Sequence, residues 1–207
     1  MKKVIVVACV LLCVLCAACS SGPKVARVDA NTQVDLSGRW NDSDVRQVCS
    51  TLIESAVNSN RIDAYIRDFQ SRNGRGVLPT VIVGNFRNTS SEHIDTKIIS
   101  TMMQTAIINS GKLEFVEGGK ARDEIRAEKT DQQFNASEGT ASAIGAEIGA
   151  NFMLQGEVNS MEEKSGNTTV RAYFVKASIT NIETGQIIWQ DQNSDIKKVI
   201  VRSKAKL

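Results

Sequence analysis

The sequence predicts an α/β protein of the α+β kind, in which helices flank one mixed sheet and the chain ends in an antiparallel meander. Two observations lead to this fold class. Over the first two-thirds of the chain, apolar β-branched runs alternate with segments whose apolar residues recur at helical spacing. Over the last third, apolar and polar residues alternate between short turn sequences, as in antiparallel strands. When helices pack on one layer of strands, the apolar stripes of the helices and the apolar face of the sheet are buried against each other.

Residues 1–18 are predicted to be the signal peptide of a lipoprotein. Two lysines open the chain, and the apolar run at residues 4–18 is 15 residues long, fewer than the ~20 that a membrane-spanning helix needs. Two alanines stand directly before Cys19, and this end resembles a bacterial lipobox, although Cys16 stands where such signals usually carry Leu. We therefore expect diacylation of Cys19. Ordinary signal cleavage without lipid is the alternative.

The mature chain is expected to hold a short tether and one globular domain. Residues 19–34 are the lipidated cysteine and a polar spacer, and residues 35–207 form a single periplasmic domain. Removal of the signal deletes two lysines and no acidic residue, so 23 basic and 23 acidic residues remain. This balance disfavours nucleic acid as a partner. Cys49 is the one cysteine of the domain, so no disulfide is expected there.

Two helices and a buried strand are expected at the start of the domain. Apolar residues recur at helical spacing over residues 43–58, directly behind possible N-cap oxygens that include that of Asn41. A second helix ends at Gly74 or Gly76 and carries a stripe formed by Ile62, Tyr65, Ile66 and Phe69. Residues 78–86 are a continuous run rich in β-branched side chains, which is typical of a central strand.

The middle of the chain is expected to contain three more helices and a strand at 113–116. Thr89 and Glu92 have the spacing of a capping box, which predicts that a helix starts there and runs to Gly111. Its expected buried face consists of Ile94, Ile98, Ile99, Met102, Met103, Ala106 and Ile107. A charged helix at 120–129 has Ile125 as its apolar anchor. The last helix follows an N-cap pair, Asn135 with Glu138, and buries Ala141, Ile144 and Ile148.

The last third is predicted to be a meander. Phe152, Leu154 and Val158 lie on one side of the first strand, and Gln155 and Glu157 lie on the other. A turn at 162–169 and a second turn at 183–186 separate it from two further strands. We expect Trp189, next to two isoleucines in the returning strand, to be buried.

Nothing in the sequence predicts catalysis. His93 is the only histidine and one imidazole cannot build a metal site or a nucleophile pair, while Gly118 and Gly119 lack the spacing of a phosphate loop. We expect no catalytic residue, metal, cofactor or small-molecule substrate. Five cations follow residue 195: Lys197, Lys198, Arg202, Lys204 and Lys206. They indicate an edge strand guarded by lysines or a tail that contacts anionic lipid or cell-wall polymer.

Six segments follow one another along the chain in this order: DLSGRWN, PTVIVGNFRNTSSEHIDT, INSGKLEFVE, RDEIRAEKTDQQ, IGAEIGANFMLQGEV and NIETGQIIWQ. Together they resemble the LpoB family of lipoprotein activators of penicillin-binding proteins, and the resemblance spans residues 34–198. It implies a TolB-N-terminal-like sheet with helices, an outer-membrane anchor and a periplasmic partner. That partner is a bifunctional peptidoglycan synthase, or penicillin-binding protein, whose polymerisation and cross-linking it stimulates. The tether here is shorter than the long proline-rich tether of well-known members.

The candidate partner surface consists of polar loops and helix ends. Its residues are Asn85, Arg87, Asn88, Glu92, Arg122 and Arg126. A domain that binds one conformation of a synthase better than another raises the population of that conformation. The runner-up is a structural or assembly lipoprotein of the cell envelope or of a secretion system, and a third reading is a hydrolase with an unrecognised site.

Overall fold

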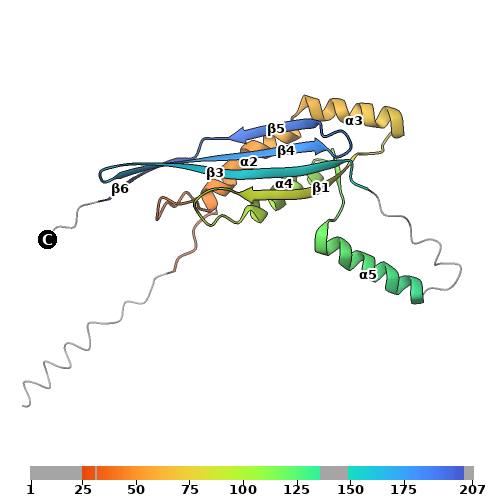
Figure 1. The fold of residues 1–207 in the computed structure, drawn as a ribbon, viewed down its shortest axis with the longest axis horizontal. Helices are drawn as coiled ribbons and strands as arrows, with labels where there is room; N and C mark the ends of the chain where they lie inside the picture. Colours follow the sequence, from red (N-terminus) through yellow and green to blue (C-terminus); the bar gives the residue numbers. More distant parts are fainter. Residues whose placement is uncertain (1–24, 31, 136–148, 203–207) are drawn as a thin grey trace, which may run out of the picture. The chain divides into compact units, whose positions relative to one another are not determined.

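The structure is a computed structural model that describes residues 25–30, 32–135 and 149–202 (Figure 1). The chain divides into two units, residues 1–32 and residues 33–207, and all of the elements below belong to the second unit. The helix expected around Ala141, Ile144 and Ile148 lies outside the described residues.

The first two helices match their sequence patterns. Helix α2 (Asp42–Val57) begins at a capping box in which Asn41 is the N-cap and Asp44 is its reciprocal partner, and it buries Cys49. Helix α3 (Asn60–Asn73) is capped by Ser59. It ends at Gly74, whose φ of 109° is a conformation that glycine adopts at little cost. Both predicted helices are therefore confirmed to within a few residues.

One mixed sheet forms the centre of the domain. Its strands are β1 (Thr80–Asn88), β2 (Glu114–Phe115), β3 (Phe152–Ser165), β4 (Thr168–Asn181), β5 (Ile187–Asn193) and β6 (Lys197–Val201). The order is β2-β1-β3-β4-β5, and β6 also pairs with β4. Strand β1 is parallel to β2 and β3, whereas β4 is antiparallel to β3, β5 and β6. The predicted fold class, including the meander, is confirmed.

Strands β3 and β4 continue beyond the part of the sheet that contains β1. The pairing of β1 with β3 ends at Val158, while the pairing of β3 with β4 continues to Ser165 and Thr168. Strand β6 lines the other side of β4 there, opposite residues 168–172. We call residues 159–165, residues 168–174 and β6 the hairpin extension (Figure 1).

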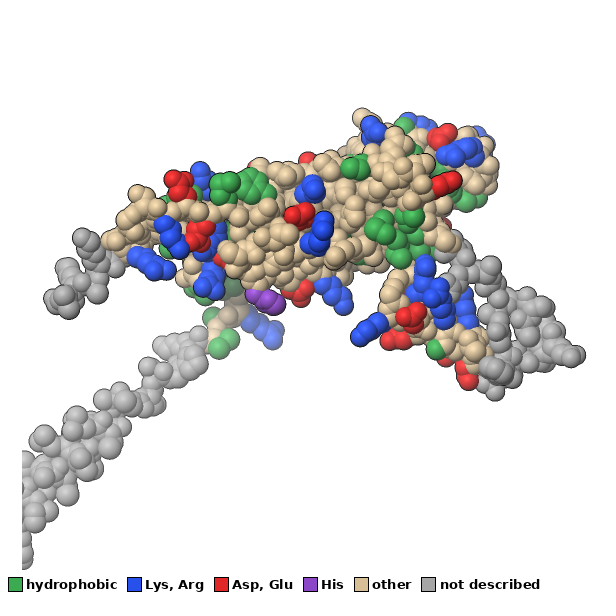
Figure 2. Space-filling view, in the orientation of Figure 1, with side chains coloured by type: hydrophobic (Ala, Val, Ile, Leu, Met, Phe, Trp, Pro, Cys, Tyr) green, Lys and Arg blue, Asp and Glu red, His purple; other side chains and the backbone are tan. Residues whose placement is uncertain are grey.

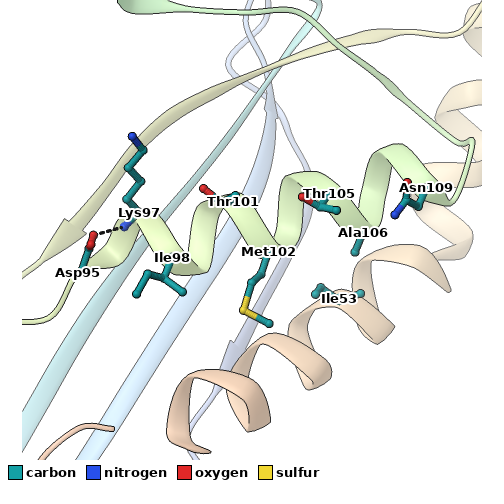
Figure 3. Close-up of a pocket in the computed structure, with 9 residues that line it drawn as sticks. All are labelled: Ile53, Asp95, Lys97, Ile98, Thr101, Met102, Thr105, Ala106 and Asn109. Atoms are coloured by element: carbon teal, nitrogen blue, oxygen red, sulfur yellow. Dashed lines mark hydrogen bonds between the residues drawn. The ribbon is translucent and has the colours of Figure 1, made fainter. Parts of the chain in front are cut away.

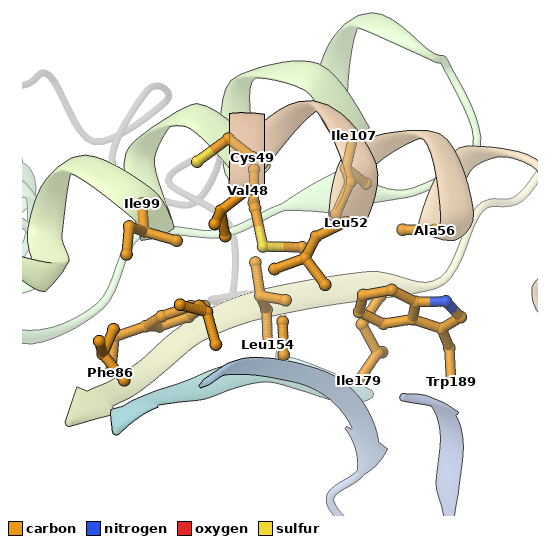
Figure 4. Packing of buried hydrophobic residues seen from close by; sticks show 14 of the residues in the cluster. Val48, Cys49, Leu52, Ala56, Phe86, Ile99, Ile107, Leu154, Ile179 and Trp189 are labelled. Carbon is orange, nitrogen blue, oxygen red and sulfur yellow. The ribbon is translucent and has the colours of Figure 1, made fainter. Parts of the chain in front are cut away.

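The two faces of the sheet differ in what covers them. The inner face packs against α2 and helix α4 (Thr96–Asn109) in one hydrophobic core (Figure 4). Residues that point to this face are fully buried, among them Leu154, Val158 and Ile179. Trp189, which is only 6% exposed, belongs to the same core, and its predicted burial is confirmed. The outer face is the one that carries the intervening residues of each strand.

Helix α4 starts later than the sequence indicated, and the capping box predicted at Thr89 and Glu92 is wrong. The N-cap is Asp95, whose carboxylate accepts a hydrogen bond from the Lys97 N–H at 3.0 Å. Thr89 instead extends the β1–β3 pairing, because its N–H donates to the Val158 carbonyl at 2.8 Å. Ile94 is buried but precedes the helix, and Ile98, expected in the core, is 49% exposed.

Helix α5 (Gly119–Asn135) is longer than predicted and contributes little to the core. Ile125, expected to anchor it, is 44% exposed. None of the α5 side chains that the structure describes belongs to the hydrophobic core. The helix is heavily charged, and near Ile125 its sequence supplies only the small apolar residues Ala121 and Ala127, which are too few and too small to build a wide buried stripe.

Candidate interaction surface

A polar hollow lies on the outer face of the sheet, where β1, β3, β4 and β5 meet. Its volume is about 350 Å³. It brings together two of the predicted surface residues, Asn85 and Arg87, and adds seven others. These are Gln155, Gly156, Glu157, Lys176, Ser178, Ile187 and Gln190. Neighbours from four strands therefore form one site that no short sequence motif describes.

The local geometry of β1 explains why Asn85 and Arg87 point outward. The register between β1 and β3 shifts between Val83 and Phe86, so Phe86 packs inward and its neighbours face the other way. Gly156 allows this packing, because an added Cβ there would lie 2.4 Å from Cε1 of the Phe86 ring. The irregular strand and the glycine opposite it together place the polar side chains of the hollow.

The hollow carries a small excess of positive charge. Arg87, Glu157 and Lys176 occupy one cross-strand row. Within the described part of the chain, neither Arg87 nor Lys176 forms an ion pair, and Glu157 accepts a hydrogen bond from the Thr89 hydroxyl at 3.0 Å. Two cations, one carboxylate and several amides can bind a polar or anionic protein surface.

Glu92, the predicted surface residue that precedes α4, lies outside the polar hollow and is engaged in contacts within the fold. Its Oε2 accepts hydrogen bonds from the Trp40 N–H at 3.0 Å and from the Tyr173 hydroxyl at 2.9 Å. Its Oε1 lies 2.6 Å from Nη1 of Arg171, an ion pair without the angles of a hydrogen bond. The side chain is 9% exposed, so these internal contacts occupy it fully.

Glu92 is part of a charge cluster that fastens residues 33–41, the N-terminal strap, to the hairpin extension. Arg171 also contacts Glu162 and donates a hydrogen bond to the Gly38 carbonyl at 3.2 Å. On β6, Nζ of Lys198 lies 2.7 Å from carboxylate oxygens of both Asp35 and Asp44. Arg171 and Lys198 therefore each have two carboxylate partners.

The cluster shifts the pKa values of its members. A hydrogen bond from Lys198 is the main cause that lowers the pKa of Asp35 to about 2. Hydrogen bonds from Lys164 and Arg171 lower the pKa of Glu162 to about 2. Burial disfavours the charged form of Lys198, yet hydrogen bonds to Asp35 and Asp44 outweigh it and raise the pKa of that amine. Burial, followed by the hydrogen bond to Glu92, raises the pKa of the Tyr173 hydroxyl.

The other predicted surface residues lie apart from the hollow. The Asn88 amide donates to the Glu92 carbonyl at 2.7 Å and so shapes the loop after β1. Arg122 donates from Nε to the Glu117 carbonyl at 2.7 Å. Arg126 is exposed on α5 and pairs with Asp123 at 3.5 Å. Sequence reasoning missed Lys176 and Gln190, although the alternation in β3 already placed Gln155 and Glu157 on one face.

A second, apolar groove runs between α2 and α4 (Figure 3). Its volume is about 650 Å³, and Ile53, Ile98 and Met102 form its apolar wall. This groove explains the exposure of Ile98, because α2 covers only part of the apolar stripe of α4. The two helices leave the outer edge of that stripe open to solvent.

His93 is exposed, and among the residues that the structure describes no group of three or more His, Cys, Asp or Glu side chains could hold a metal ion. No helix in the described ranges has both the length and the apolar character needed to cross a bilayer.

Comparison with known proteins identifies the family. No sequence among curated proteins is significantly similar to this one. The C-terminal domain of LpoB from Salmonella enterica is 14% identical, with 73% of this chain and 97% of that chain covered and a TM-score of 0.40. The corresponding domain from Escherichia coli is 19% identical, with 66% and 98% covered and a TM-score of 0.35.

Lipoprotein GNA1162 from Neisseria meningitidis is 16% identical, with 61% of this chain and 88% of that chain covered and a TM-score of 0.33. At such TM-scores these pairs carry no argument about function. A family model described as "Peptidoglycan-synthase activator LpoB" matches residues 44–194, which is well over half of the chain. The chain therefore belongs to the LpoB family of peptidoglycan-synthase activators.

Proposed function

We propose that this protein is an outer-membrane lipoprotein that binds and activates a bifunctional penicillin-binding protein in the periplasm. The observation that carries the proposal is the match of the family model over residues 44–194. The activator has no catalytic step of its own and acts by binding the active conformation of the synthase more tightly. A ~100-fold shift in that equilibrium needs only ~2.7 kcal/mol of differential affinity.

The polar hollow around Asn85 and Arg87 is the proposed docking surface for the synthase. Two features support this choice. Arg87 and Lys176 have no ion-pair partner within the described residues, so their charges are available to an anionic partner. The hollow also lies away from the core that α2 and α4 cover. Charge at such a surface contributes mainly to the association rate and to specificity.

Charge reversal tests this surface. Arg87→Glu and Lys176→Glu should each raise the activator concentration needed for half-maximal synthase stimulation about tenfold, which corresponds to ~1.4 kcal/mol. Stimulation of glycan polymerisation by the purified synthase is the readout. Lys97→Glu, an exposed lysine on α4, is the matched control and should behave like the unaltered protein. Equal effects at all three positions would assign the loss to net charge and remove the hollow from the proposal.

The proposed lipid anchor at Cys19 has a separate test. Cys19→Ala should release the protein from the membrane fraction and abolish labelling by an alkyne fatty acid, because a thioether-linked diacylglycerol needs the cysteine sulfur. The purified domain should still stimulate the synthase in solution. Labelling that persists in the Cys19→Ala variant would show that the lipid is attached elsewhere.

A further inference from the structure

The outer face of the hairpin extension carries exposed apolar side chains. Met161 is 66% exposed, Val199 64% and Val201 69%. Strand register places them on one face, because Met161 pairs with Ala172, while Val199 pairs with Val170. The apolar patch, as we call it, comprises Met161, Val170, Phe174, Val199 and Val201, which lie on three adjacent strands.

The side chains of the patch are not covered by the core of the domain, because the opposite, inner face of the same strands is the one that packs against other residues. Tyr173 is fully buried there against Trp40, with ring centroids 5.1 Å apart. Lys198 and Arg171 hold the N-terminal strap on that side. A Cβ at Gly38 would meet Ile200 at 2.4 Å, which shows how closely the strap approaches β6. The patch therefore faces solvent in the folded domain.

Two cations lie beside the patch. Lys197 shares its face at the register position of Ala172, and the exposed Arg202 follows directly after β6. Glu163 is the one carboxylate on the outer face of the extension. After Asp195 the sequence has five cations and no acidic residue, and one of the five, Lys198, belongs to the charge cluster on the inner face. Figure 2 shows hydrophobic side chains at this end of the described chain, together with Lys and Arg side chains and a few acidic ones.

The strap also brings the N-terminal connection of the domain to this same end. Asp35, at the start of the strap, lies 2.7 Å from Lys198 of β6. Cys19 and Asp35 are 16 positions apart in the sequence, which a fully extended chain spans in at most ~55 Å. A lipid on Cys19 would therefore hold the hairpin extension within reach of the membrane.

We propose that the apolar patch and its cations dock on the anionic phospholipid surface of the membrane that holds the anchor. In cells this rests on the lipid anchor of the proposed function. Apolar side chains enter the headgroup region and nearby lysine and arginine side chains meet anionic headgroups, as in other interfacial segments. A second copy of the chain is a poorer occupant, because it would bring the same cations to both sides of the contact.

The test uses the mature chain, residues 19–207, without lipid as the Cys19→Ser variant. It should sediment with vesicles of phosphatidylethanolamine and phosphatidylglycerol, less with phosphatidylcholine vesicles, and less as salt increases. Lys197→Gln and Arg202→Gln should each weaken binding about fivefold, equivalent to ~1 kcal/mol for one cation at an anionic surface. The double variant Met161→Ser and Val199→Ser should weaken it about tenfold or more.

Two control variants match these changes at other places on the domain. Ile187→Ser changes an isoleucine that is 47% exposed at the far end of β5, and Lys97→Gln removes a cation on α4. Both should bind vesicles normally. Absence of vesicle binding, or equal loss in patch and control variants, would overturn the proposal. So would a dimer in solution that Met161→Ser dissociates, because the patch would then be a contact between copies.

Synthase stimulation in solution, without membranes, separates this proposal from the proposed function. Variants of the patch should stimulate the synthase normally. Suppose instead that the patch variants lose synthase stimulation while the unaltered chain binds no vesicles. The patch would then contact a protein partner, and only the membrane proposal would be overturned. Vesicle binding by a chain that stimulates no synthase would instead overturn the proposed function and leave the membrane surface intact.

Discussion

Glu92 shows how one side chain can serve the fold where the sequence indicated a binding role. It stands in an exposed-looking polar loop, yet it accepts from Trp40 and Tyr173 and pairs with Arg171. A buried arginine that loses a carboxylate partner keeps its desolvation cost without the compensating attraction. The residue therefore contributes to stability and leaves none of its polar atoms for a partner.

Glu92→Gln should lower the free energy of unfolding by ~3 kcal/mol, since it removes the charge partner of a mostly buried guanidinium. Urea denaturation measures the change. Asp68→Asn is the matched control, because the Asp68–Arg72 pair lies on the surface of α3 with both side chains over 60% exposed. Exposed pairs contribute ~0–1 kcal/mol. Similar values for the two variants would show that Glu92 has no special structural role.

At the scale of elements, the start of α4 depends on a choice between two possible caps. Thr89 with Glu92 has the better sequence spacing, but both side chains find partners elsewhere in the fold. Asp95 caps the helix instead. Capping boxes are local, and hydrogen bonds to strands or buried arginines form only once the chain has folded. The helix therefore begins where no tertiary contact competes for the capping side chain.

Asp95→Ala should cost ~1 kcal/mol through loss of the N-cap and should speed amide hydrogen exchange in the first turn of α4. Thr89→Ala should also destabilise the protein, by ~1 kcal/mol, because the Thr89 hydroxyl donates to Val158. It should leave exchange in α4 unchanged. Faster exchange in that helix after Thr89→Ala would restore Thr89 as its cap.

At the scale of the whole molecule, the charge cluster makes stability depend on pH. The folded-state pKa values of Asp35 and Glu162 are both about 2, below their ordinary values of 3.8 and 4.5. A carboxyl group whose pKa falls on folding binds more protons when unfolded. Its contribution is therefore complete near neutral pH and is lost as the pH falls from about 5 to about 2. The attachment of the strap to β6 should loosen in that range.

Asp35→Asn should be less stable than the unaltered protein at neutral pH. The difference should shrink as the pH falls toward 2, because Asp35 is then mostly protonated in the unfolded state and about half protonated in the folded state. Denaturation midpoints across that pH range measure it. Glu183→Gln, an exposed carboxylate outside the cluster, is the control. A difference between Asp35→Asn and the unaltered protein that stays constant with pH would exclude titration of Asp35 as its cause.

The sequence by itself determined the types and order of most described elements, the bounds of α2 to within one residue and the burial of Trp189. It predicted one returning strand at the end of the chain, where the structure has two, β5 and β6. The features that it determined depend on periodicity within one element, because an apolar stripe at helical or alternating spacing has only one face to bury. The alternation in β3 likewise assigned Gln155 and Glu157 to one face before any strand partner was known. Family membership followed from the same segments in the same order.

Only the tertiary structure decided which polar residues lie together. Arg87 and Lys176 are far apart in the sequence. They line the same polar hollow because both pair with Glu157 of β3, the strand between β1 and β4. Glu92 is 52 residues from Trp40 and 81 from Tyr173, distances over which no local pattern extends. The periodicity of apolar residues predicts on which face of its own helix or strand a side chain lies. Strand order and register, which the whole core sets, decide what stands opposite that face.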